Sequence, residues 1–60
     1  LDKALQAYTR LIDLDPENPQ HYCNRGIIHK IQGNADQAKA DLAEAAQRGN
    51  AEAASLLNSF

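Results

Sequence analysis

The stretch LDPENPQHYCNRG, from Leu14 to Gly26, decides the fold. Pro16 ends the apolar helical pattern that precedes it, because proline cannot continue a helix and pushes the residue before it toward extended geometry. Asn18 then has a side chain suited to a helix N-cap, and Pro19 suits the first helical position, where its missing N–H costs nothing. The stretch therefore predicts the end of one helix, a tight turn and the start of a second helix.

Apolar residues recur at helical spacing before this turn. They follow the i, i+3, i+4, i+7 rule, which predicts a first helix over residues 1–15 with one apolar stripe. The stripe consists of Leu1, Ala4, Leu5, Tyr8, Leu11 and Ile12.

The later helix boundaries follow from glycine and asparagine. Gly33 supplies the left-handed turn that ends the second helix. Asn34, followed three residues later by Gln37, resembles a capping box for a third helix. Gly49 and Asn50 repeat this stop and start before a short fourth helix. The pattern carries no strand signal, so we expect an all-α chain of about four antiparallel helices.

The size of the chain limits how stable one core can be. The 60 residues, with eight acidic and six basic side chains and a net charge of −2, form at most one small domain. Chains this short usually need disulfides, a metal or a neighbour, and a single cysteine cannot form an internal disulfide. Because the chain begins at Leu1 without methionine, inside a helical pattern, we expect a piece of a longer protein.

Composition argues against several classes of partner. Charges of both signs are interspersed, whereas nucleic-acid binding usually requires a clustered basic face. No apolar run approaches the roughly 20 residues that span a bilayer, so we expect no membrane insertion. A lone cysteine is typical of a reducing compartment such as the cytoplasm.

The only cysteine, Cys23, lies between two histidines, which raises the question of a reactive or metal-binding site. On a helix, however, His21 and Cys23 point about 160° apart, and Cys23 and His29 about 120° apart. Zinc requires four ligands in tight geometry, and the chain has no CxxC or HxxxH pair. We therefore expect no catalytic residue, no metal site and no cofactor, and do not expect an enzyme.

The two halves of the chain are related by an offset of 34 residues. LDKALQAY at 1–8 aligns with ADQAKADL at 35–42, so that Asp2 matches Asp36 and Ala4 matches Ala38. One known class of repeat protein is built from helix–turn–helix units of 34 residues. In this register the sequence resembles the tetratricopeptide repeat family.

Several positions carry the resemblance. Tyr22 lies where the family prefers an aromatic residue, and Gly26 where close helix packing leaves no room for a side chain. Ala38, Leu42 and Ala45 match the family's small–large–small packing row. The resemblance implies a fragment of an α-solenoid: the second helix of a preceding repeat over 1–15, one complete repeat over 19–49, and a terminal capping helix over 51–60.

The chain also departs from the family pattern. Arg25 and His29 stand where the family usually has leucine and tyrosine, and Asn50 stands where proline is usual. From Ala45 onward, the sequence AAQRGNAEAASLL resembles the related Sel1-like repeats.

The resemblance implies a protein–protein interaction scaffold, because the first helix of each repeat in the family lines a concave groove for a peptide or helix. The groove-lining residues of the second helix, at positions 20, 23, 24, 27 and 31, form one stripe by helical periodicity. It is distinct from the Tyr22–Gly26–His29 stripe, which packs on the flanking helices. Ile27 and Ile31 are informative because apolar residues outside a core usually meet a partner, although they could also pack on the first helix or a neighbouring repeat. The groove residues would be Gln20, Cys23, Asn24, Ile27, Lys30 and Ile31.

Two other functions remain open at this point. In the first, the chain binds another copy of itself, by dimerisation or helix exchange. The face used would consist of Leu1, Leu5, Tyr8 and Ile12. In the second, the chain is a regulatory repeat segment of a larger enzyme or transport machine.

Overall fold

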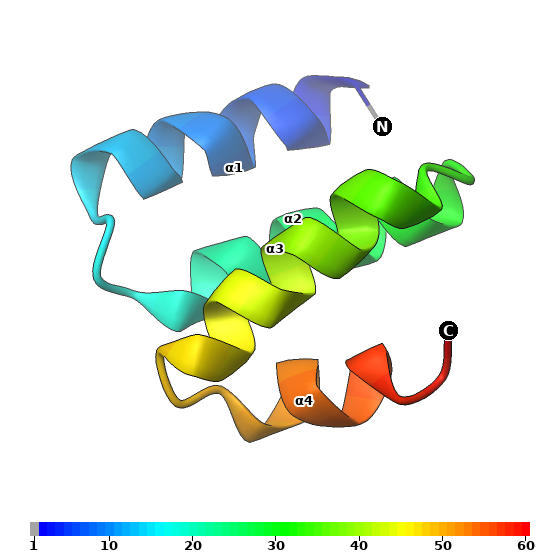
Figure 1. Ribbon diagram of the computed structural model, residues 1–60. Helices are drawn as coiled ribbons and strands as arrows, with labels where there is room; N and C mark the ends of the chain where they lie inside the picture. Colours follow the sequence, from blue (N-terminus) through cyan, green and yellow to red (C-terminus); the bar gives the residue numbers. More distant parts are fainter. Residues whose placement is uncertain (1) are drawn as a thin grey trace.

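The computed structural model describes residues 2–60 and, in that range, consists of α-helices with no strand. The helices are α1 (Asp2–Leu14), α2 (Pro19–Ile31), α3 (Ala35–Gln47) and α4 (Ala51–Leu57). Successive helices run in opposite directions, with α1 and α4 on either side of the α2–α3 pair (Figure 1). The predicted all-α, antiparallel helix–turn–helix fold is confirmed.

Two asparagines cap helices as the sequence predicts. The Asn18 side chain accepts a hydrogen bond from the backbone N–H of Gln20 at 3.0 Å. Asn50 Oδ1 accepts one from the N–H of Ala53 at 2.8 Å. Such bonds satisfy backbone donors that the first turn of a helix leaves free.

The capping box predicted at the start of α3 is wrong. The Asn34 side chain makes no capping hydrogen bond, and only its backbone carbonyl accepts one, from Ala38 N–H at 2.9 Å. The reason is local geometry, because Asn34 has ψ of 72° whereas Asn18 has the extended ψ of 108° that N-caps favour. The preceding Gly33 does adopt the predicted left-handed conformation, with φ of +84°.

The core lies where α2, α3 and α4 meet. Gly26 allows α2 to approach α3 closely, because a Cβ added there would lie only 2.9 Å from Leu42 Cγ. Tyr22, Ile27, Leu56 and Leu57 pack around the buried centre. The fully buried residues of this cluster are Cys23, Leu42, Ala45 and Ala53.

Helix α1 is held less tightly, since it packs only on α2 among the larger helix contacts. The sequence predicted Ile12 as part of a face that binds another copy, but Ile12 is buried, with 7% of its surface exposed. It is therefore not free to meet another copy. Leu5 and Tyr8 of the same predicted face are half-buried, and Leu1 lies outside the described residues.

Candidate functional site

The residues predicted to line a groove divide into a surface set and one core residue. Gln20, Lys30 and Ile31 are exposed, and Asn24 and Ile27 are half-buried. Of these, Ile31 is the most informative, because 63% of this apolar side chain is exposed. The polar end of the set is ordered by a hydrogen bond from Gln20 Nε2 to Asn24 Oδ1 at 3.1 Å. We refer to these five residues as the α2 face.

Cys23 does not belong to this face, and that part of the prediction is corrected. Its side chain is fully buried in the core beside Ala53 of α4. The thiol donates a hydrogen bond to Glu52 Oε1 at 3.5 Å. Burial, and then the neighbouring Glu52 carboxylate, raise the pKa of the Cys23 thiol to about 11. The group therefore stays protonated at neutral pH, and it is neither a groove residue nor a reactive thiolate.

The structure also shows why the two histidines and the cysteine make no joint site. His21 Nε2 lies 3.5 Å from Asp15 Oδ2 in the turn before α2. His29 Nε2 faces Asp41 Oδ2 of α3 at 3.7 Å, whereas the Cys23 thiol is bonded to Glu52 of α4. Within residues 2–60 no group of three histidine, cysteine or acidic side chains is arranged to hold a metal ion.

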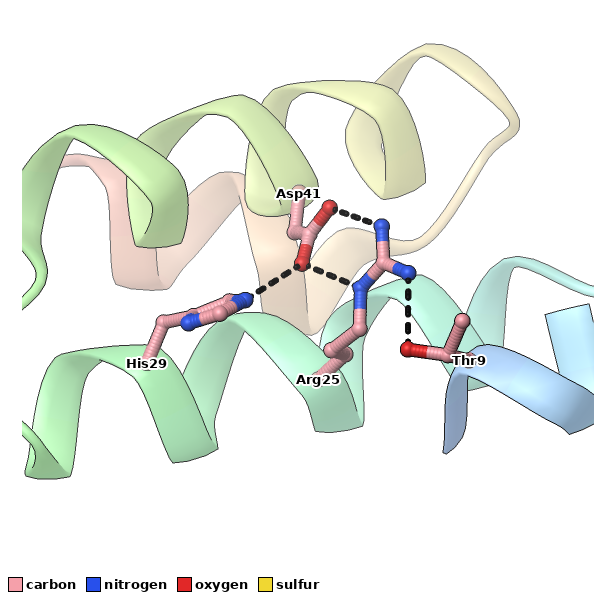
Figure 2. A network of polar contacts seen from close by, with 4 residues as sticks. All are labelled: Thr9, Arg25, His29 and Asp41. Atoms are coloured by element: carbon pink, nitrogen blue, oxygen red, sulfur yellow. Dashed lines mark hydrogen bonds and ion pairs between the residues drawn. The ribbon is translucent and has the colours of Figure 1, made fainter. Parts of the chain in front are cut away.

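The departures from the family pattern on α2 build a polar cluster that ties three helices together (Figure 2). Arg25 donates two hydrogen bonds to Asp41 of α3, from Nε at 2.7 Å and from Nη2 at 2.8 Å. A third bond runs from Arg25 Nη1 to Thr9 Oγ1 of α1 at 3.3 Å. The bond to Asp41 raises the pKa of the Arg25 guanidinium. We call Thr9, Arg25, His29 and Asp41 the polar cluster.

The polar cluster is structural in character. Asp41 is only 7% exposed, and its carboxylate is satisfied by the bidentate bond to Arg25. His29 Nδ1 is buried without a hydrogen-bond partner among the described residues. A carboxylate paired with arginine in this way fixes how α2 and α3 pack.

Sequence reasoning missed a second cluster, at the far end of α2. The Phe60 ring lies 5.1 Å from Lys30 Nζ of α2 and 5.5 Å from Lys39 Nζ of α3. Lys30 Nζ also donates a hydrogen bond to Ser59 Oγ at 3.2 Å. Helical periodicity placed Phe60 on the apolar face of a fourth helix over 51–60, but α4 ends at Leu57 and Phe60 follows it. Its two lysine contacts extend the α2 face toward α3.

None of the four helices, in the part of the chain that the structure describes, combines the length and apolarity needed to cross a bilayer.

Comparison with known proteins bears on the family. A family model described as "TPR repeat" matches residues 1–33. Tetratricopeptide repeat protein 36 of Caenorhabditis elegans is 36% identical over 45 residues, which cover 75% of this chain and 25% of that protein. The chain thus spans about a quarter of the length of this relative. No solved structure matches the chain. Four antiparallel helices with a glycine-mediated contact between α2 and α3, together with these matches, show that the chain belongs to the tetratricopeptide repeat family.

Proposed function

We propose that the chain is a protein-interaction module whose α2 face forms the floor of a groove for a peptide or helix of a partner protein. The observation that carries this proposal is the 63% exposure of Ile31, beside Lys30 and half-buried Ile27. An exposed apolar side chain next to one that is only half-buried is typical of an interaction surface.

Two further features support the proposal. Tetratricopeptide repeats are generally protein–protein interaction modules, and the proteins that contain them are generally non-catalytic scaffolds. The α2 face is also well supported from behind, because Ile27 packs against the core cluster. At its other end, Asn50 Nδ2 donates a hydrogen bond to Gln20 Oε1 at 3.4 Å. A surface held in place before binding loses less entropy when a partner docks.

The test is a substitution of the most exposed apolar residue of the face. Ile31→Glu should weaken the affinity of the chain for the peptides it binds on an immobilised peptide array by about tenfold. The reason is that the substitution places a charge in an apolar contact. An exposed position should change the free energy of unfolding by no more than about 0.5 kcal/mol. Ile27 is a poorer choice, since its contact with the core would confuse loss of binding with loss of fold.

Leu14→Glu is the matched control, because Leu14 is an equally apolar residue on α1 with 76% exposure. It should leave array binding unchanged. If Leu14→Glu abolishes binding while Ile31→Glu retains it, the interaction surface lies on α1 and the proposal is wrong.

Self-association is the second candidate, and a specific surface favours it. The side of α1 away from α2 exposes Leu11 and Leu14, at 38% and 76%. They share this open face of α1 with Lys3, Gln6, Ala7 and Arg10. This face replaces the one predicted around Ile12, which is buried.

For self-association through this face, the molar mass from light scattering should approach that of a dimer as concentration rises a hundredfold. The melting temperature should rise with it, because dimerisation stabilises the folded state by mass action. Leu14→Glu should return the chain to a monomer. A monomer throughout the concentration range would remove this candidate and leave the α2 face as the proposed surface.

A further inference from the structure

We propose that α4 and the residues around it are a releasable cover on part of the α2 face, and that release of this cover turns Cys23 into a groove residue. The inference rests on the proposed function, because it names a regulation of the same surface. We call residues 50–60 the C-terminal cover.

The C-terminal cover contacts α2 near both of its ends. Near the start of α2, Asn50 Nδ2 donates a hydrogen bond to Gln20 Oε1 at 3.4 Å. In the last turn of α2, Lys30 Nζ donates a hydrogen bond to Ser59 Oγ at 3.2 Å, and the Phe60 ring lies 5.1 Å from the same Nζ. Two of the five residues of the α2 face are therefore in contact with another part of the chain itself.

Cys23 lies beneath the middle of the cover. On a helix with about 100° per residue, Cys23 belongs to the same stripe as Asn24 and Ile27 of the α2 face. It is nevertheless fully buried, because Ala53 of α4 packs against it, and Glu52 Oε1 accepts a hydrogen bond from its thiol at 3.5 Å. Release of α4 would therefore add Cys23 to the groove beside Ile27.

The contacts that hold the cover are weaker than those between α2 and α3. Helix α4 has only seven residues, which is too short for a helix to be stable without packing. Within residues 50–60 only Ala53 is fully buried, whereas Leu56 and Leu57 are half-buried. The hydrogen bonds from the cover to α2 measure 3.2, 3.4 and 3.5 Å, whereas those that join Arg25 to Asp41 measure 2.7 and 2.8 Å. Because neighbouring units stabilise a repeat fold pair by pair, α4 should open while the other helices stay folded.

The experiment measures how fast the Cys23 thiol of the 60-residue chain reacts with a small aromatic disulfide. The thiolate attacks the S–S bond of the reagent, forms a mixed disulfide and releases one coloured thiolate, which absorbance records. Burial and Glu52 raise the pKa of the covered thiol to about 11, so the reaction takes place from the open form. The labelling rate should exceed the rate that global unfolding permits, as measured by circular dichroism in urea, by at least about tenfold. It should also depend less steeply on urea, because opening of α4 exposes less surface than global unfolding.

Two asparagine caps provide a matched pair of variants. Asn50→Ala removes the N-cap of α4 and should speed labelling of Cys23 about fivefold, because it destabilises the closed form. Asn18→Ala removes the same kind of bond from α2. Since α2 is folded in both the closed and the open form, this variant should change the labelling rate by less than about twofold. Equal acceleration by the two variants, or the urea dependence of global unfolding, would mean that Cys23 reacts only when the whole chain unfolds, and would overturn the proposal.

Leu57→Ala tests whether the cover regulates the α2 face. Leu57 packs against the core cluster from α4, so its truncation should favour the open form. The labelling rate and the affinity for the array peptides should then rise in parallel, by about tenfold each, because a partner of the whole stripe binds only the open fraction. Faster labelling with unchanged affinity would overturn the regulation and leave the proposed groove in place. Failure of the proposed function has a different signature: Ile31→Glu would leave the affinity unchanged, while Asn50→Ala would still speed labelling, and the regulation would fall with the groove.

Discussion

Replacing Arg25 by alanine should lower the free energy of unfolding by about 3 kcal/mol, because it leaves the buried Asp41 carboxylate without its counter-charge. Arg25 donates two hydrogen bonds to that carboxylate, at 2.7 and 2.8 Å. Only His29 would remain beside it, at 3.7 Å. A chain of this size has a free energy of unfolding of about 3–9 kcal/mol, so the substitution should remove between a third and all of it. Urea unfolding at neutral pH, followed by circular dichroism, measures the change.

The control replaces both partners of the ion pair. Exchanging a buried ion pair for apolar residues of similar volume is often neutral or stabilising by about 1–4 kcal/mol. The double variant Arg25→Leu with Asp41→Leu should therefore be about as stable as the unaltered chain. Arg25→Leu alone should be as unstable as Arg25→Ala. A loss below about 0.5 kcal/mol in Arg25→Ala would contradict the burial of this pair.

If Arg25→Ala is destabilising and the double variant is not, the apolar and the polar contacts between α2 and α3 have different roles. The fully buried side chains Ala38, Leu42 and Ala45 remove apolar surface from water, which is the main source of stability. The polar cluster adds direction, because a bidentate arginine bond forms in only one relative placement of the helices. Its bond to Thr9 extends that constraint to α1.

The ends of the helices could be predicted from the sequence because they are decided locally. Pro16, Asn18, Gly33 and Gly49 act through the geometry of their own or adjacent residues, without help from distant parts of the chain. Gly33 and Gly49 indeed adopt φ of +84° and +98°. Asn34 shows the limit of this reasoning, because a suitable residue type does not ensure the backbone angle that a cap requires.

The faces of the helices were harder to predict. Helical arithmetic gives the direction of a side chain around its own helix, but it does not show which neighbour lies there. Cys23 points toward the side that α4 covers, where Ala53 packs against it. Ile12 points toward α2 and is 7% exposed. Helical periodicity therefore placed both residues at a surface, whereas in the structure both lie in contacts between helices.

The polar cluster could be predicted from the sequence only in part. Arg25 and His29 were recognised as departures from the family pattern, where leucine and tyrosine are usual. Their partner Asp41 lies 16 residues from Arg25 in the chain. Pairing the two requires the register between α2 and α3, which depends on how closely the helices approach at Gly26. That approach leads to the second large prediction.

Replacing Gly26 by alanine should lower the free energy of unfolding by about 2 kcal/mol, although alanine favours a helix over glycine by about 1 kcal/mol. The added Cβ would lie 2.9 Å from Leu42 Cγ, 3.1 Å from Leu42 Cδ2 and 3.2 Å from the carbonyl oxygen of Ala38. Leu42 is fully buried and the carbonyl belongs to α3 itself, so neither can move aside cheaply. The thermal melting temperature should fall by about 8–16 °C.

Two further variants separate this steric effect from other costs. Leu42→Ala alone should cost about 3 kcal/mol through the cavity it leaves. The double variant Gly26→Ala with Leu42→Ala should be more stable than the sum of the single effects by about 1 kcal/mol, because the new methyl group partly fills that cavity. Gly33→Ala is the control for backbone strain, since nothing lies within 4 Å of a Cβ added there and the φ of Gly33 is +84°. If Gly26→Ala instead stabilises the chain, helix propensity outweighs the contact, and α2 and α3 lie farther apart in solution than the distances to Leu42 and Ala38 require.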